Sequence, residues 1–120
     1  MGALALALVV LIAVLHLWFM VLESFLWQTP LGMKVFRTTP EQAAATAVLA
    51  KNQGLYNGFL AAGLVWSLTP WCGDPRGAQL FFSGCVLVAG VVGAITASRG
   101  ILFVQALPGA AALAAVWLAG

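Results

Sequence analysis

Two groups of polar side chains interrupt an otherwise apolar chain, and both have residue types that could do chemistry. The first group, His16, Met20 and Glu23, has a spacing of four and then three residues, which places the side chains on one face of a helix. A carboxylate in a membrane-spanning helix is rare and usually faces the bundle interior. One interpretation makes Glu23 a general base that exchanges protons with His16. In the alternative, Glu23 is solvated near the interface or held by Lys51 or Arg37, and His16 is a neutral, hydrogen-bonded histidine.

The second group is the run from Lys51 to Gly58, which contains amides, a phenol and glycines. In a helix its polar side chains fall within one sector, whereas Gly54, Gly58 and Ala62 form a separate stripe. The stripe predicts a packing seam, because small residues let helix backbones approach closely. The polar sector would either hydrogen-bond neighbouring helices, at about 0.6 kcal/mol each, or line a polar pocket that opens toward the cytoplasmic side. The residues of this sector are Asn52, Gln53, Tyr56 and Asn57.

The composition identifies the kind of protein that must position these groups. Of the 120 residues, 63% are hydrophobic and 7% are charged, whereas a soluble domain carries about 25% charged residues. A helix needs roughly 20 apolar residues to cross a bilayer, so the chain has room for four crossings. Long apolar runs do not fit a β-barrel, whose strands alternate in polarity. The sequence therefore predicts an all-α integral membrane four-helix bundle, with residues 1–120 forming a single transmembrane domain.

Helix boundaries follow from the breakers and caps. Thr39 as cap with Pro40 in the first turn begins the second helix, and the short connection at residues 98–100 makes the last two helices antiparallel neighbours. Pro108 should bend the last helix or free a carbonyl group. Trp27 lies near a predicted helix end, where an interfacial anchor is expected. The predicted helices span residues 3–27, 40–68, 78–97 and 101–117.

Basic residues predict how the bundle is oriented. Lys34, Arg37 and Arg99 fall in the first and third connections, whereas Arg76 in the second is offset by Asp74. The positive-inside rule then places the first and third connections in the cytoplasm. The predicted topology is up-down-up-down, with both termini on the non-cytoplasmic side.

Several functional classes are not indicated by these residues. One histidine and two separated cysteines match no metal-ligand spacing, and no motif indicates a cofactor. Cys72 and Cys85 are expected to be free thiols. Five scattered basic residues form no patch for nucleic acid.

Two stretches resemble a known family. The runs 50–64, from Ala50 to Leu64, and 98–105, from Ser98 to Gln105, together with Glu23 and the connection 27–36, are similar to the small four-helix bacterial membrane proteins called domain of unknown function 1304. The resemblance covers nearly the whole chain. It implies a multi-pass protein of the bacterial inner membrane and implies no activity.

A weaker resemblance connects the chain with the membrane-associated proteins of eicosanoid and glutathione metabolism (MAPEG), which are four-helix enzymes acting on lipophilic substrates. Placing Asn52 on their asparagine puts Tyr56 on their tyrosine. Val48 and Leu55 then stand where that family has an arginine and a glutamate that help to hold glutathione. The resemblance therefore implies a shared bundle and oligomeric assembly, without the glutathione ligands.

Three functional hypotheses remain open. In the first, the protein binds a small lipophilic or amphipathic ligand in a polar pocket between the first two helices. In the second, it is an enzyme in which Glu23 and Tyr56 transfer protons and Arg99 holds an anionic end of the substrate. In the third, it is a structural or transporter subunit, and in each case a homo-oligomer in the lipid bilayer is expected. The candidate ligand-binding residues are His16, Asn52, Gln53, Asn57 and Arg99, with Glu23 and Tyr56 as candidate catalytic residues.

Overall fold

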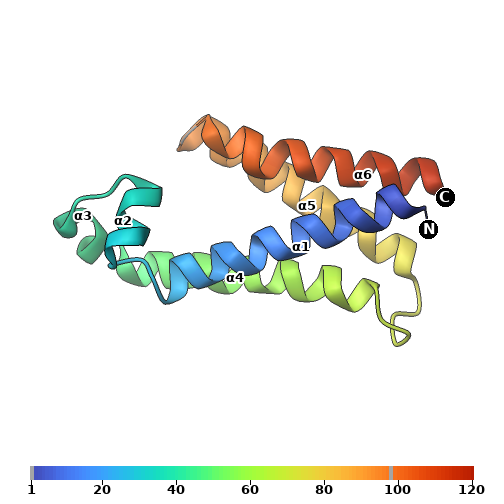
Figure 1. Ribbon diagram of the computed structural model, residues 1–120, viewed down its shortest axis with the longest axis horizontal. Helices are drawn as coiled ribbons and strands as arrows, with labels where there is room; N and C mark the ends of the chain where they lie inside the picture. Colours follow the sequence, from blue (N-terminus) through green and yellow to red (C-terminus); the bar gives the residue numbers. More distant parts are fainter. Residues whose placement is uncertain (1, 98) are drawn as a thin grey trace. The chain divides into compact units, whose positions relative to one another are not determined.

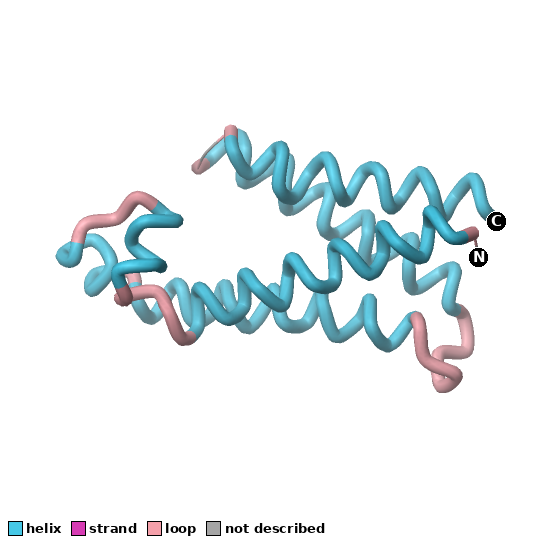
Figure 2. The backbone as a smooth tube through the Cα atoms, viewed as in Figure 1, coloured by secondary structure: helices cyan, strands magenta, loops and turns pink. Residues whose placement is uncertain are grey.

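The computed structural model describes residues 2–97 and 99–120, and in this part of the chain all regular structure is helical (Figure 2). The predicted all-α class is therefore confirmed. Ser98, in the predicted third connection, lies outside the described residues. The elements are α1 (Ala3–Ser24), α2 (Pro30–Phe36), α3 (Pro40–Ala45), α4 (Ala47–Ser67), α5 (Pro75–Thr96), the π-helical segment η1 (Leu102–Ala106) and α6 (Leu107–Ala119).

The chain forms two compact units. The first unit comprises Met1–Val14 and Leu60–Gly120, and the second comprises Leu15–Phe59.

Within residues 2–97 and 99–120, three helical segments are long and apolar enough to cross a membrane: α1, α5 and Leu102–Ala119. The helix α4 is not among them, since the polar run from Lys51 to Asn57 lowers its hydropathy. Helices that can span a membrane are therefore present, as the composition predicts.

Several predicted helix bounds differ from the structure, and α5, predicted to begin at residue 78, begins at Pro75. The first helix ends at Ser24 rather than at residue 27, and the connection after it contains the short helix α2. The Thr29 hydroxyl oxygen begins α2 by accepting a hydrogen bond from the Gly32 N–H at 3.2 Å. The predicted helix 40–68 is divided at Thr46, whose hydroxyl donates to the Gln42 carbonyl at 2.7 Å. This bond to the preceding turn competes with regular helical geometry.

The first unit contains an antiparallel pair of helices, α5 and α6, which lie side by side (Figure 1). Gly90 of α5 lies against Ala106, and Gly109 lies against Val86 and Leu87. Residue numbers that rise along one helix while they fall along the other confirm the predicted antiparallel arrangement. The buried core of this unit consists of Ala5, Val9, Ile12, Ala13, Leu64, Val86, Ala112 and Val116.

The start of the last helix adapts to Pro108, the position that the sequence marks as irregular. Proline has no N–H to donate to the preceding turn. Here the Leu107 N–H donates to the Leu102 carbonyl, five residues earlier, which makes the turn π-helical. As a result Ile101 and Ala106, five residues apart, both face α5, against Gly93 and Gly90 respectively.

In the second unit, Trp27 joins the chain after α1 to the break between α3 and α4. Its indole N–H donates to the Ala43 carbonyl at 3.1 Å and to the Thr46 hydroxyl oxygen at 3.2 Å. Its ring lies 4.8 Å from that of Phe36, between centroids. Trp27 therefore holds the two short helices α2 and α3 in place, beyond the anchoring role that the sequence predicts for it.

Replacing Trp27 with phenylalanine keeps a ring and removes the N–H donor. We expect the free energy of unfolding to fall by about 1 kcal/mol, the usual contribution of one hydrogen bond. Thermal unfolding in detergent would measure this change. The same substitution at Trp71, whose side chain is 80% exposed, serves as control, and equal shifts for the two variants would contradict the assigned role of the indole.

Candidate functional site

The candidate site is built around a buried pair of side chains, Glu23 near the end of α1 and Asn57 in the middle of α4. The Asn57 amide Nδ2 donates a hydrogen bond to Glu23 Oε1. Both side chains are buried, and both lie in the second unit. From the sequence, Lys51 and Arg37 are the expected alternative partners for this carboxyl group. Both of those side chains are exposed, and the structure identifies Asn57 as the partner.

Glycines in α4 allow the close approach of the two helices at this site. A Cβ added at Gly54 would collide with Ser24 Oγ and lie 3.2 Å from the Met20 carbonyl oxygen, and one added at Gly58 would lie 2.9 Å from Met20 Sδ. The predicted packing seam is therefore confirmed at these two glycines, with α1 as the partner helix. Ala62, the third predicted member, is exposed.

The four polar residues of α4 do not share one environment, contrary to the expected division into a polar face and a small-residue face. Asn57 is buried beside the glycines, whereas Asn52, Gln53 and Tyr56 are exposed. The reason is geometric, because the polar sector spans roughly 140° and Asn57 lies at its edge, only about 60° from Gly54. Asn57 is therefore buried in the packed face, whereas the other three polar side chains lie outside it.

His16 is fully buried, and its ring lies edge-on to Phe19 with the centroids 5.2 Å apart. It precedes Glu23 by seven residues, which corresponds to about 10 Å along the helix axis. General acid–base partners must come within hydrogen-bond distance or be bridged by one water. A direct proton transfer between His16 and Glu23 is therefore not supported by this geometry.

The remaining candidate residues lie apart from the buried pair. Tyr56 is 58% exposed, and its ring contacts that of Phe59 at 6.3 Å between centroids. Arg99 is exposed and belongs to the first unit. The enzymatic hypothesis, which combines Glu23, Tyr56 and Arg99, stays a prediction.

Within residues 2–97 and 99–120, no three histidine, cysteine or acidic side chains come together as metal ligands would. Cys72 is a buried free thiol and Cys85 a half-buried one.

The fold and the buried pair define a class: an all-α protein with helices able to cross a membrane and a carboxyl group hydrogen-bonded between two of them. The family described as "Protein of unknown function (DUF1304)" matches residues 10–117, and the chain belongs to this family. It is also similar to the uncharacterized protein YpaA of Lactococcus lactis subsp. lactis (strain IL1403), with 30% identity over 107 residues that cover 88% of this chain and 89% of YpaA. No solved structure matches the chain.

Proposed function

We propose that this protein is a multi-pass protein of the bacterial inner membrane that binds a small lipophilic or amphipathic ligand where α1 and α4 meet, around Glu23 and Asn57. In this proposal α4 is the second of four crossings in an up-down-up-down bundle whose termini are both non-cytoplasmic. The single observation that carries the ligand site is the hydrogen bond of a buried glutamate to a buried asparagine.

The length and surroundings of α4 support this crossing. Its 21 residues extend about 31 Å, which matches the hydrocarbon thickness of roughly 30 Å. Asn57 donates one of its two amide N–H groups to Glu23, which lowers the cost of placing this amide in a bilayer. Lys51 is exposed, and its long side chain can extend toward the interface.

The chemistry of the pair supports a ligand that donates hydrogen bonds. A carboxylate has about four lone-pair sites, and the Asn57 amide occupies one of them on Oε1. The Asn57 carbonyl oxygen is a further acceptor. A hydroxyl or amine group of the ligand could therefore bind here, with its apolar body along the exposed apolar side chains. Asn52, Gln53 and Tyr56 are exposed on adjacent turns of α4 and would extend the polar contacts.

Mass spectrometry of small molecules that remain bound through purification tests this proposal without a prior choice of ligand. Replacing Glu23 with glutamine keeps the shape and exchanges one acceptor oxygen for an amide N–H. We expect it to lower the amount of the retained molecule by about tenfold, since a ligand donor then loses a hydrogen bond that contributes about 1.4 kcal/mol.

A matched control is Glu41→Gln, the same change at an exposed position of the second unit. It should leave retention at the wild-type level. If both variants retain the same amount as the wild type, or if nothing specific is retained by the wild type, the ligand site is wrong and the pair serves packing alone.

We also propose that the protein forms a homo-oligomer, although the glycine seam no longer supports this. The glycines at positions 54 and 58 pack against α1 of the same chain, so they are not free to form a seam between copies. The proposal of a homo-oligomer therefore depends on the limited room for a pathway or a complete site inside so short a bundle.

A further inference from the structure

A cavity lies in the first unit, where the end of α4, the loop after it, the start of α5 and the end of α6 meet. Its volume is about 780 Å³, which is within the range of roughly 300–1,000 Å³ typical of ligand sites. The residues at helix ends give it a mixed lining with two opposite charges, Asp74 and Arg76. We call it the helix-end cavity.

Arg76 is held in place by the last turn of α6. Its guanidinium lies 5.1 Å above the centre of the Trp117 ring and donates to the Trp117 carbonyl at 3.2 Å. Gly120 lies directly against the same group, where an added Cβ would lie 2.5 Å from Arg76 Cζ. A guanidinium has five N–H donors, and one of them is used here, so others are available to a phosphate.

Asp74 is held by the backbone of α5. Its Oδ1 accepts a hydrogen bond from the Gly77 N–H at 2.9 Å, which caps the start of the helix. No ion pair joins Asp74 to Arg76, both of which the structure describes. The cavity therefore presents a positive and a negative group that do not neutralise each other.

Gln79 adds an amide to this lining. Its side chain is 97% buried, at 3% relative exposure, yet it lines the cavity. Among the described residues no hydrogen bond engages its amide. Because Gln79 lines the cavity, its amide can hydrogen-bond a polar ligand there.

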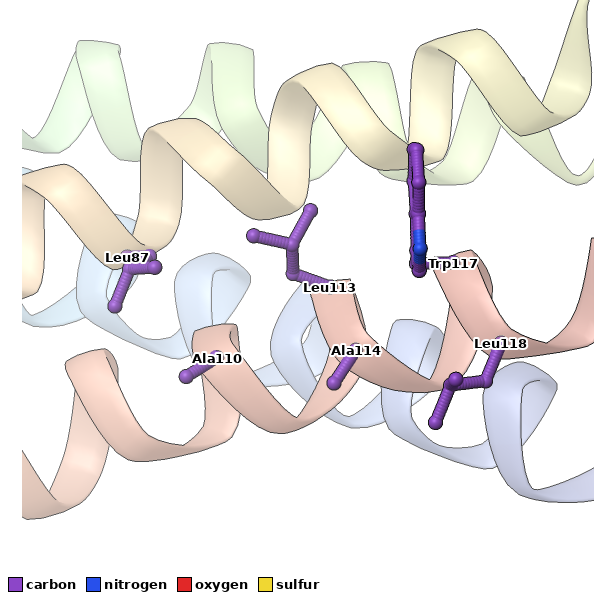
Figure 3. Close-up of a pocket in the computed structure, with 6 residues that line it drawn as sticks. All are labelled: Leu87, Ala110, Leu113, Ala114, Trp117 and Leu118. Carbon is purple, nitrogen blue, oxygen red and sulfur yellow. The ribbon is translucent and has the colours of Figure 1, made fainter.

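An apolar groove of about 450 Å³ lies along α5 and α6 (Figure 3). Leu87 comes from α5, and the other labelled residues come from α6, including Leu113, Ala114 and Trp117. Trp117 therefore lines the groove, and its ring also carries the guanidinium of Arg76. A charged contact for a head group thus stands next to an apolar surface for a hydrocarbon chain.

We propose that this face binds a phospholipid whose head group carries both a phosphate and a primary ammonium group, such as phosphatidylethanolamine. The phosphate would bind Arg76 and the Gln79 amide, the ammonium would bind Asp74, and an acyl chain would occupy the groove beside Trp117. Both charges of the cavity are then paired by the two charges of one zwitterion.

The test adds single phospholipids to the detergent-purified protein and measures retention by native mass spectrometry. Phosphatidylethanolamine should be retained about tenfold better than phosphatidylcholine, whose ammonium has no N–H to donate to Asp74. Phosphatidylglycerol should be retained no better than phosphatidylcholine, because Asp74 offsets its net negative charge. Greater retention of phosphatidylglycerol than of phosphatidylethanolamine would overturn the proposal in favour of a simple anion site.

Variants separate the two charges. Asp74→Asn keeps a good helix cap and should lower the retention of phosphatidylethanolamine to that of phosphatidylcholine. Arg76→Gln should lower the retention of both lipids by about tenfold. Lys34→Gln removes an exposed cation in the other unit and should change the retention of neither lipid. If Asp74→Asn leaves the preference intact, or if Arg76→Gln and Lys34→Gln behave alike, the assignment is wrong.

The groove has its own test. Ala114→Trp places a bulky ring on the groove surface and should reduce retention of all three lipids, with thermal unfolding confirming that the variant is folded. Wild-type retention by the folded variant would show that the acyl chain does not lie there.

Discussion

Asn57→Leu is expected to lower the free energy of unfolding by about 2 kcal/mol. The leucine has the same number and branching of side-chain heavy atoms, but it leaves the buried carboxyl group of Glu23 without its amide donor. Leaving a buried polar partner unsatisfied costs roughly 1–3 kcal/mol, and more when that partner is charged. Denaturant titration in detergent, followed by circular dichroism, would measure the change.

Two further variants make this result specific. The double variant Glu23→Met with Asn57→Leu removes both polar groups and should recover most of the lost stability, because replacing both partners of a buried hydrogen bond with apolar groups can be nearly neutral. Asn52→Leu, the same substitution on an exposed turn of the same helix, should change stability by less than about 0.5 kcal/mol. If Asn57→Leu is as mild as Asn52→Leu, the hydrogen bond to Glu23 does not stabilise the fold.

A large loss of stability from a single added methyl group is expected at Gly90. A Cβ at this position would lie 2.6 Å from Ala106 Cα and 2.8 Å from Ala106 Cβ. Since the contact involves backbone of the last helix, Gly90→Ala must push the α5–α6 pair apart. Overpacking of this kind costs typically 1–3 kcal/mol, which thermal unfolding of the purified variant would detect.

Gly84 offers a control in the same helix, because an added Cβ there meets nothing within 4 Å. Alanine is a better helix former than glycine by about 0.8–1 kcal/mol, so Gly84→Ala should leave stability unchanged or raise it. A loss of stability at Gly84 equal to that at Gly90 would mean that helix packing is not what distinguishes the two sites.

Much of the fold could be predicted from the sequence because it depends on composition and on local signals. Apolar runs of membrane length fix the helical class, and Thr39 with Pro40 marks a helix start that the structure confirms as a capping box. The helix α2 and the break at Thr46 were missed. Both involve bonds of a threonine hydroxyl to nearby backbone, at Thr29 and Thr46, together with contacts of Trp27 to Phe36 and Ala43. Periodicity alone does not report such contacts.

The candidate site was predicted in part. Glu23 turns inward toward the helix with the polar run, as the interpretation of an intramembrane carboxylate favours. The sequence could not decide that Asn57, alone of the four polar residues, contacts Glu23. A small rotation of the helix moves an amide at the edge of the polar sector either into the packed face or out of it. The sequence contains no functional signal at Asp74, Arg76 and Gln79. These residues line one cavity only because three helix ends meet there in the folded chain.

The π-helical turn before Pro108 also has a consequence for how the last two helices are aligned. In a regular α-helix, residues five positions apart point about 140° away from each other, so Ile101 and Ala106 could not both meet the glycines of α5. The π-helical turn contains one residue more than an α-helical turn would. This extra residue changes the direction in which all later side chains of the helix point. A slip of the hairpin by a single residue would turn Ala106 and Gly109 away from α5 together. The alignment of the pair is thus fixed by the backbone itself, although its helices carry few polar groups that could specify it.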